Sequence, residues 1–205
     1  IDEQYRKMED LITVDEIESL MDIYNIGKAP LSYAMGFGEI TITRYLAGQV
    51  PSFEYSKRMR MALYYPKLMR KQLEKNKERI GEVAYKKSIR ATNELIDSFC
   101  ISDKMLATIS YLFKELHEIP PFTLHKLLYM VQQNYAAKYG ETLFEEEHEE
   151  WGQGPVYRKV YDLMKDFKYN PMDDKRFAII KNRYEDLDKK EKAMINSIIK
   201  KYKKG

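Results

Sequence analysis

The sequence predicts a mainly α-helical protein in three parts: an N-terminal helix-turn-helix bundle over residues 1–65, a helical connector over 66–101, and an α-rich α+β domain over 102–205 with a small sheet or hairpin. Two observations support this fold class. Apolar residues recur at helical spacing in most segments, and helix-capping residues precede several of them. The composition, with 44% hydrophobic and 33% charged residues in 205, is that of a globular chain that can bury one or two cores.

Capping residues predict the first helix. Thr13 and Glu16 have the spacing of a capping box and precede apolar residues at helical spacing. We therefore expect a helix that runs to about Tyr24 and is ended by Gly27. A later helix from about Phe53 to Tyr65 contributes apolar side chains to the same small core.

The segment from Lys28 to Ala47 has the pattern of a helix-turn-helix. Small Ser32 and Gly36 lie where two crossing helices approach each other and where the chain turns. Apolar side chains that should be buried between the helices are Leu31, Met35, Phe37, Ile42 and Tyr45. If the second helix begins at Glu39, its outward face carries Glu39, Ile40, Thr43 and Arg44. Because such a face enters the major groove in proteins of this kind, we expect a DNA-binding protein.

Three residues of the motif have specific expected roles. Arg44 suits a bidentate contact with guanine, which we favour over a role with phosphate or solvent. Glu39 suits either a contact with cytosine or stabilisation of the helix N-terminus. Lys28, at the start of the first motif helix, suits a phosphate contact.

Charge is unevenly distributed, although the net charge is only +3. Residues 57–90 hold twelve Lys or Arg against three Glu, whereas residues 1–22 hold eight Asp or Glu against Arg6 and Lys7. The basic segment fits either phosphate contacts or a solvated helix whose basic side chains cover apolar neighbours. Pro66 suits the first turn of a helix, and the polar pattern of residues 87–98 fits a connector or a dimerisation arm.

The second domain is predicted to begin near Ser102. Helix starts are predicted at Ser102 or Asp103, at Thr123, and at Asp188, which forms a capping box with Glu191. The first of these helices should end at Pro120 and Pro121, and the second at Gly140. The last helix carries an apolar stripe that includes Ile195.

Strands are expected only in short segments. Leu143–Trp151 alternates imperfectly and predicts a strand or an extended loop, and Arg176–Arg183 predicts a second short strand. Gly154 and Pro155 are expected to begin a helix that continues to about Phe167, because proline suits the first turn of a helix.

We consider two roles for the aromatic and turn residues near this region. Trp151, Gly154 and Pro155 suit either the core and the turns of the domain, which we favour, or a surface that binds a partner protein. If exposed, Tyr129, Tyr157 and Tyr161 would suit a protein-binding groove, although helical spacing predicts that at least half of them lie in the core.

No catalytic or metal site is expected. The three histidines and the acidic run 145–150 lack the regular spacing of zinc ligands, and a solvated acidic patch that faces a basic partner fits them better. Cys100 is the single cysteine, so no disulfide forms within the chain. Together with the lack of an apolar membrane span or a secretory signal, this predicts a cytoplasmic protein that needs no cofactor.

Two stretches resemble known families. The run GFGEITITRYLAGQVPS at residues 36–52, together with YRKMEDLITVDEI at 5–17, resembles the Xre-like DNA-binding domain of the MqsA type. The runs LHKLLYMVQQNYAAKYGETLF at 124–144 and WGQGPVYRKVY at 151–161 resemble the Panacea domain, also called the SocA-like antitoxin domain.

The resemblance implies a bacterial antitoxin with two activities. The first domain would bind operator DNA and repress the operon, and the Panacea domain would neutralise a toxin encoded by a neighbouring gene. A homodimer is expected. The DNA-contacting helix of each copy would then bind one of two half-sites about one DNA turn apart. The alternatives are a stand-alone transcriptional regulator, or an adaptor that delivers a bound protein to a protease. A hydrolase that uses the acidic run is a third and weaker reading.

Overall fold

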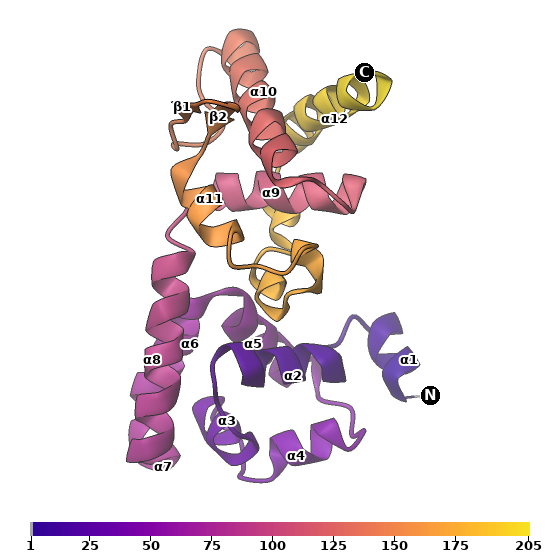
Figure 1. The fold of residues 1–205 in the computed structure, drawn as a ribbon. Helices are drawn as coiled ribbons and strands as arrows, with labels where there is room; N and C mark the ends of the chain where they lie inside the picture. Colours follow the sequence, from indigo (N-terminus) through magenta and orange to yellow (C-terminus); the bar gives the residue numbers. More distant parts are fainter. Residues whose placement is uncertain (1) are drawn as a thin grey trace. The chain divides into compact units, whose positions relative to one another are not determined.

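Helices dominate the computed structural model, which describes residues 2–205, and the β-structure within those residues is one two-stranded antiparallel hairpin (Figure 1). The expectation of a mainly α protein with a small hairpin is therefore confirmed. The chain divides into two units, Ile1–Ser98 and Phe99–Gly205. Residues 66–98, which the sequence suggested as part of a connector, lie within the first unit.

The first unit is entirely helical over its described residues. Its helices are α1 (Asp2–Met8), α2 (Val14–Ile23), α3 (Lys28–Ala34), α4 (Thr41–Leu46), α5 (Phe53–Tyr64), α6 (Pro66–Lys75), α7 (Lys77–Ile80) and α8 (Glu82–Ser98). The capping box of Thr13 and Glu16 is present at the start of α2, and Pro66 occupies the first turn of α6, as predicted. Helix α1 was not predicted from the sequence.

Helices of the first unit enclose one apolar core. Helix α2 packs against α5, α3 packs against α4 and α7, and α6 packs against α5 and α8. Side chains that are fully buried in this core include Ile17, Leu20, Leu31, Ile42, Met59, Leu63, Met69 and Leu73. Buried Tyr24 also donates a hydrogen bond from its hydroxyl to the Ala62 carbonyl, 2.7 Å away, and so links α2 to α5.

The second unit combines helices, the hairpin and three short 3-10 helices. Its elements are α9 (Asp103–Leu116), α10 (Pro121–Tyr139), β1 (Glu149–Trp151), β2 (Gly154–Val156), α11 (Arg158–Met164), η1 (Pro171–Asp173), η2 (Lys175–Ile179), η3 (Arg183–Asp186) and α12 (Lys189–Lys204). Helix α9 is central, because every residue from Met105 to Phe113 is buried. Helices α10 and α12 and the 3-10 helix η3 pack against it.

Several boundaries in this unit follow the predicted capping residues. The Ser102 hydroxyl accepts from the Met105 amide at the start of α9, and Gly140 ends α10 in the left-handed conformation. The capping box of Asp188 and Glu191 begins α12. The predicted cap at Thr123 is wrong, because α10 begins two residues earlier at Pro121, where the helix needs no amide hydrogen.

The helix that was predicted to begin at Gly154 is the main error. Gly154, Pro155 and Val156 form β2, and α11 begins only at Arg158. Gly154 has φ +119°, which is not a helical conformation, and it pairs with Trp151 across the hairpin. The helical signal of a Gly-Pro pair was therefore overridden by pairing with the preceding segment.

The two predicted strands had different outcomes. Within Leu143–Trp151 only β1, Glu149–Trp151, is a strand, and the residues before it form a loop. The strand predicted for Arg176–Arg183 is wrong, because η2 and the start of η3 occupy this segment. Asp174 begins η2 by accepting the Arg176 amide hydrogen at 3.0 Å, and this local bond favours a turn over an extended chain.

Candidate functional site

Helices α3 and α4 form the predicted pair with a tight turn between them. The five side chains predicted to lie between them, Leu31, Met35, Phe37, Ile42 and Tyr45, are all buried. Gly36 has φ +76°, a conformation that favours glycine, at the point where α3 ends. The Ser32 hydroxyl joins the helices: it donates to the Lys28 carbonyl at 3.0 Å and accepts from the Ile42 amide at 3.1 Å.

The second helix of the pair begins later than predicted. Helix α4 starts at Thr41, with Ile40 as its N-cap residue, and not at Glu39. The Thr41 amide donates to the Gly38 carbonyl at 3.1 Å, so the residues between them form a turn. Glu39 and Ile40 consequently precede the helix.

The residues proposed to read DNA are exposed. Glu39, Ile40, Thr43 and Arg44 face solvent at the start and along one side of α4, and Lys28 is exposed at the first position of α3. Among the residues that the structure describes, the guanidinium group of Arg44 has no ion pair or hydrogen bond. A free cation on an outward helix face is available for an anionic or hydrogen-bond-accepting partner.

Arginine side chains from outside the pair fix its backbone. Arg6 of α1 is fully buried, donates to the Tyr45 carbonyl at 2.9 Å and also donates to the Gln49 carbonyl. The Tyr45 carbonyl lies in the last turn of α4, where backbone acceptors lack partners within the helix, and Gln49 lies in the segment that follows α4. Helix α1 therefore holds the end of α4 through one side chain.

The turn between α3 and α4 is held in the same way. Arg58 of α5 donates to the Met35 carbonyl at 2.9 Å and lies over the rings of Phe37 and Tyr55. Arg79 of α7 donates to the Phe37 carbonyl at 3.0 Å. Sequence reasoning missed these two hydrogen bonds, because each joins residues more than twenty positions apart and has no local signal.

The basic segment 57–90 therefore has two kinds of cation. Some are structural: Arg60 pairs with Glu16 at 3.1 Å and with Asp10 at 3.0 Å. Burial opposes the charge of Arg60, but the hydrogen bonds from Glu16 and Asp10 raise its pKa above the ordinary value. In the described part of the chain, six lysines of the segment have no ion pair: Lys57, Lys67, Lys71, Lys75, Lys77 and Lys87.

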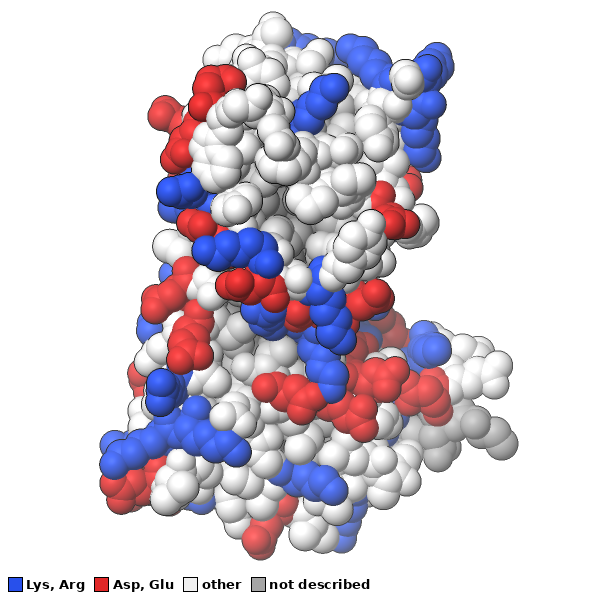
Figure 2. Space-filling model, in the orientation of Figure 1, with Lys and Arg blue, Asp and Glu red and all other residues white. Residues whose placement is uncertain are grey.

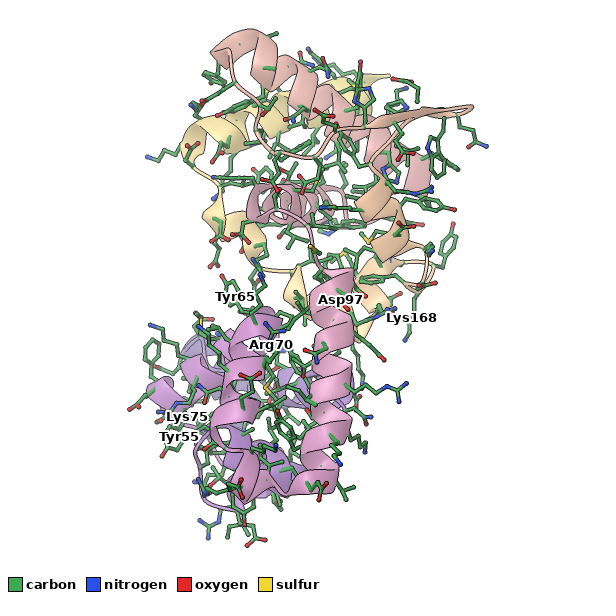
Figure 3. The ribbon with its side chains drawn as sticks, turned by 90° about the vertical axis from the view of Figure 1, so that its left-hand side faces the viewer. Tyr55, Tyr65, Arg70, Lys75, Asp97 and Lys168 are labelled. Carbon is green, nitrogen blue, oxygen red and sulfur yellow. The ribbon has the colours of Figure 1, made fainter. Side chains whose placement is uncertain are left out.

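These free lysines come from helices α5, α6, α7 and α8 of the first unit. Figure 2 shows Lys and Arg side chains gathered at the lower left of the molecule, over α7 and the beginning of α8. Lys75 extends outward from the end of α6 (Figure 3). Cations on such a surface bind phosphate groups without regard to base sequence.

In the second unit, the hairpin positions Trp151. Its ring is partly buried and meets the ring of Tyr161 edge-on, with 5.0 Å between the centroids, and Arg158 lies 5.2 Å from its centre. The indole nitrogen donates to the Glu149 carboxylate at 2.8 Å. Gly154 and Pro155 are partly buried in the strand opposite. Trp151 thus joins the hairpin to α11.

The two candidate tyrosines differ in exposure. Tyr157 is 1% exposed and its pKa is raised by burial, so its ring belongs to the core. Its amide donates to Nδ1 of His125 at 3.2 Å, which links β2 to α10. Tyr129 is partly exposed, and its ring meets the ring of His148 edge-on with 4.8 Å between the centroids.

Some side chains of the acidic run 145–150 make contacts that stabilise the fold. Glu146 accepts hydrogen bonds from the amide and the hydroxyl of Ser102, and His148 lies 3.0 Å from Glu150. Figure 2 shows a red patch of Asp and Glu side chains at the upper left, over the hairpin. Within residues 2–205, no three His, Cys, Asp or Glu side chains come together as a metal site requires.

Comparison with known proteins gives a family match within the second unit. Residues 124–205, less than half of the chain, match the family model described as antitoxin SocA-like, Panacea domain. The predicted resemblance of the C-terminal segment is confirmed, whereas the resemblance of residues 5–52 to an Xre-like domain stays a prediction. A search of curated proteins and one of solved structures gave no match. No helix in the described residues has the length and apolar character of a membrane span.

Proposed function

We propose that this protein is an antitoxin that binds and neutralises a toxin encoded by a neighbouring gene. The observation that carries the proposal is the match of residues 124–205 to the SocA-like antitoxin model. Neutralisation by direct binding needs a stable docking surface and no catalytic group. The central buried helix α9 and the helices around it supply such a stable support.

The first unit would repress the antitoxin's own operon. Support comes from the buried inner faces of α3 and α4, the exposed outer residues Thr43 and Arg44, and the free lysines nearby. Arg44 would contact base edges, and Lys28 would contact phosphate. Two copies would bind as a dimer to half-sites about one DNA turn apart, since a single helix pair covers only a few base pairs.

Two measurements on the full chain test these activities separately. Co-expression with the tagged product of the neighbouring gene, followed by size-exclusion chromatography, should give one complex that contains both proteins. Gel-shift titration should show tighter binding to the DNA upstream of the operon than to a scrambled sequence of the same composition. Separate elution would refute the antitoxin proposal, and equal affinity for both DNAs would refute specific repression.

A further inference from the structure

The second unit contains an apolar cavity that the proposed function has not yet used. It has a volume of about 230 Å³ and lies between the end of α9, the start of α10 and α11. Its apolar walls include Phe113, Ile119, Leu124, Met164 and Phe167. An apolar cavity of about 150 Å³ can hold benzene, so this one has room for a single substituted aromatic ring.

The lining of this cavity includes a hydrogen-bond donor, the ring of His125. His125 lines the cavity, and its Nδ1 accepts the Tyr157 amide hydrogen, so Nε2 carries the ring proton. Burial lowers the pKa of His125 from 6.5 to about 4, and the ring therefore stays a neutral N–H donor above pH 5. Within the described residues Nε2 has no hydrogen-bond partner. An apolar occupant without an acceptor would leave this donor unpaired.

The edge of the cavity carries positive charge, which favours an occupant with an acidic residue next to the inserted side chain. Lys165 and Lys168 lie at its edge against one acid, Glu118. Lys165 is 3.5 Å from Asp162, but the Lys168 ammonium group has no ion pair in the part of the chain that the structure describes. Lys168 extends from the loop after α11 (Figure 3). Tyr169, also at the edge, is 94% exposed, and exposed aromatic side chains beside a cavity are typical of protein-binding surfaces.

We propose that this cavity receives a tyrosine side chain of the toxin, presented next to an acidic residue. The phenol ring fills the apolar volume, its oxygen accepts a hydrogen bond from the Nε2–H group of His125, and the neighbouring carboxylate pairs with Lys168. This inference rests on the proposed antitoxin function for the identity of the partner. The chemistry of the cavity is independent of that function.

Small probes of the tyrosine side chain test the cavity on the full chain without any toxin. NMR titration should give a Kd for 4-methylphenol at least ten times lower than that for toluene, which lacks the oxygen. His125→Asn keeps an acceptor for the Tyr157 amide but is too short to place a donor where Nε2 lies, and should make the two affinities equal. The peptide acetyl-Glu-Tyr-amide should bind more tightly than acetyl-Lys-Tyr-amide, and Lys168→Ala should remove the difference. Equal affinity of the wild type for 4-methylphenol and toluene overturns the inference.

A matched pair of variants then connects the cavity with the partner. Met164→Trp fills the cavity, whereas Met130→Trp changes a partly buried methionine of α10 that does not line it. Circular dichroism selects folded variants. Met164→Trp should lose phenol binding and growth protection against the neighbouring toxin, and Met130→Trp should keep both. Protection by a folded Met164→Trp variant overturns the inference while leaving the antitoxin function intact; failure of the wild type to protect is a failure of the proposed function itself.

Discussion

Replacing Ser32 with alanine should destabilise the first unit, because it removes the hydrogen bond that joins α3 to α4. The Ser32 hydroxyl is fully buried and accepts the Ile42 amide hydrogen at 3.1 Å. Because Ile42 lies in the first turn of α4, its amide has no partner within the helix. Leaving a buried donor unpaired costs about 1–3 kcal/mol. For a unit of this size, a cost of ~2 kcal/mol lowers the melting temperature by roughly 8–16 °C.

The two units can be followed separately during unfolding, because Trp151 is the single tryptophan of the chain and lies in the second unit. Urea unfolding should show an earlier transition by far-ultraviolet circular dichroism and an unchanged transition by tryptophan fluorescence. Ser98→Ala, a change at an exposed serine of α8, is the matched control and should leave both transitions in place. A Ser32→Ala protein within about 0.5 kcal/mol of the wild type would refute the reasoning, since that is the range of neutral surface changes.

Three further predictions concern DNA, pH and the hairpin. Arg44→Ala should cost roughly 1–3 kcal/mol of operator binding and relax the preference for the operator sequence, whereas Lys28→Ala should weaken binding to all sequences alike. Gel shifts at several salt concentrations measure both effects. An Arg44→Ala protein with an unchanged sequence preference would contradict the assignment. His125 has its pKa lowered to about 4 in the folded chain, so between pH 6.5 and 4 the unfolded state binds more protons and stability falls as the pH falls. The loss at pH 5.5 relative to pH 7.5 should be about 1.4 kcal/mol and should be absent in His125→Asn, as measured by urea unfolding with tryptophan fluorescence; equal pH profiles of the two proteins would be the contrary result. Gly154→Ala should destabilise the second unit by about 1–2 kcal/mol, because alanine is strained at φ +119°. Gly152→Ala should be neutral, because φ is not positive there and a Cβ meets open space. Thermal unfolding that ranks the two variants in the opposite order would contradict the hairpin geometry.

Local signals explain which elements could be predicted. The capping boxes at Thr13 and Asp188 involve residues three positions apart, so the sequence alone contains the whole interaction. The buried positions of α3 and α4 follow from helical periodicity in the same way. In both cases the residues that decide the structure are neighbours in the sequence.

Elements that depend on distant partners were predicted less well. Whether Gly154 begins a helix or a strand is decided by its pairing with Trp151, and the local Gly-Pro signal favours the wrong outcome. The arginines that hold the helix pair act across long separations, 39 positions in the case of Arg6 and Tyr45. The cavity at His125 likewise forms only when α9, α10 and α11 come together. Such features need the folded chain to be recognised.

The central claim, that this chain neutralises a toxin, is tested most directly by bacterial growth. The neighbouring gene should be expressed from an inducible promoter, alone and together with the full chain, and colonies should be counted on inducing plates. The account predicts arrest when the neighbouring gene is expressed alone and full recovery of colonies when the antitoxin is present. Arrest that persists in the presence of soluble, folded antitoxin would contradict the account.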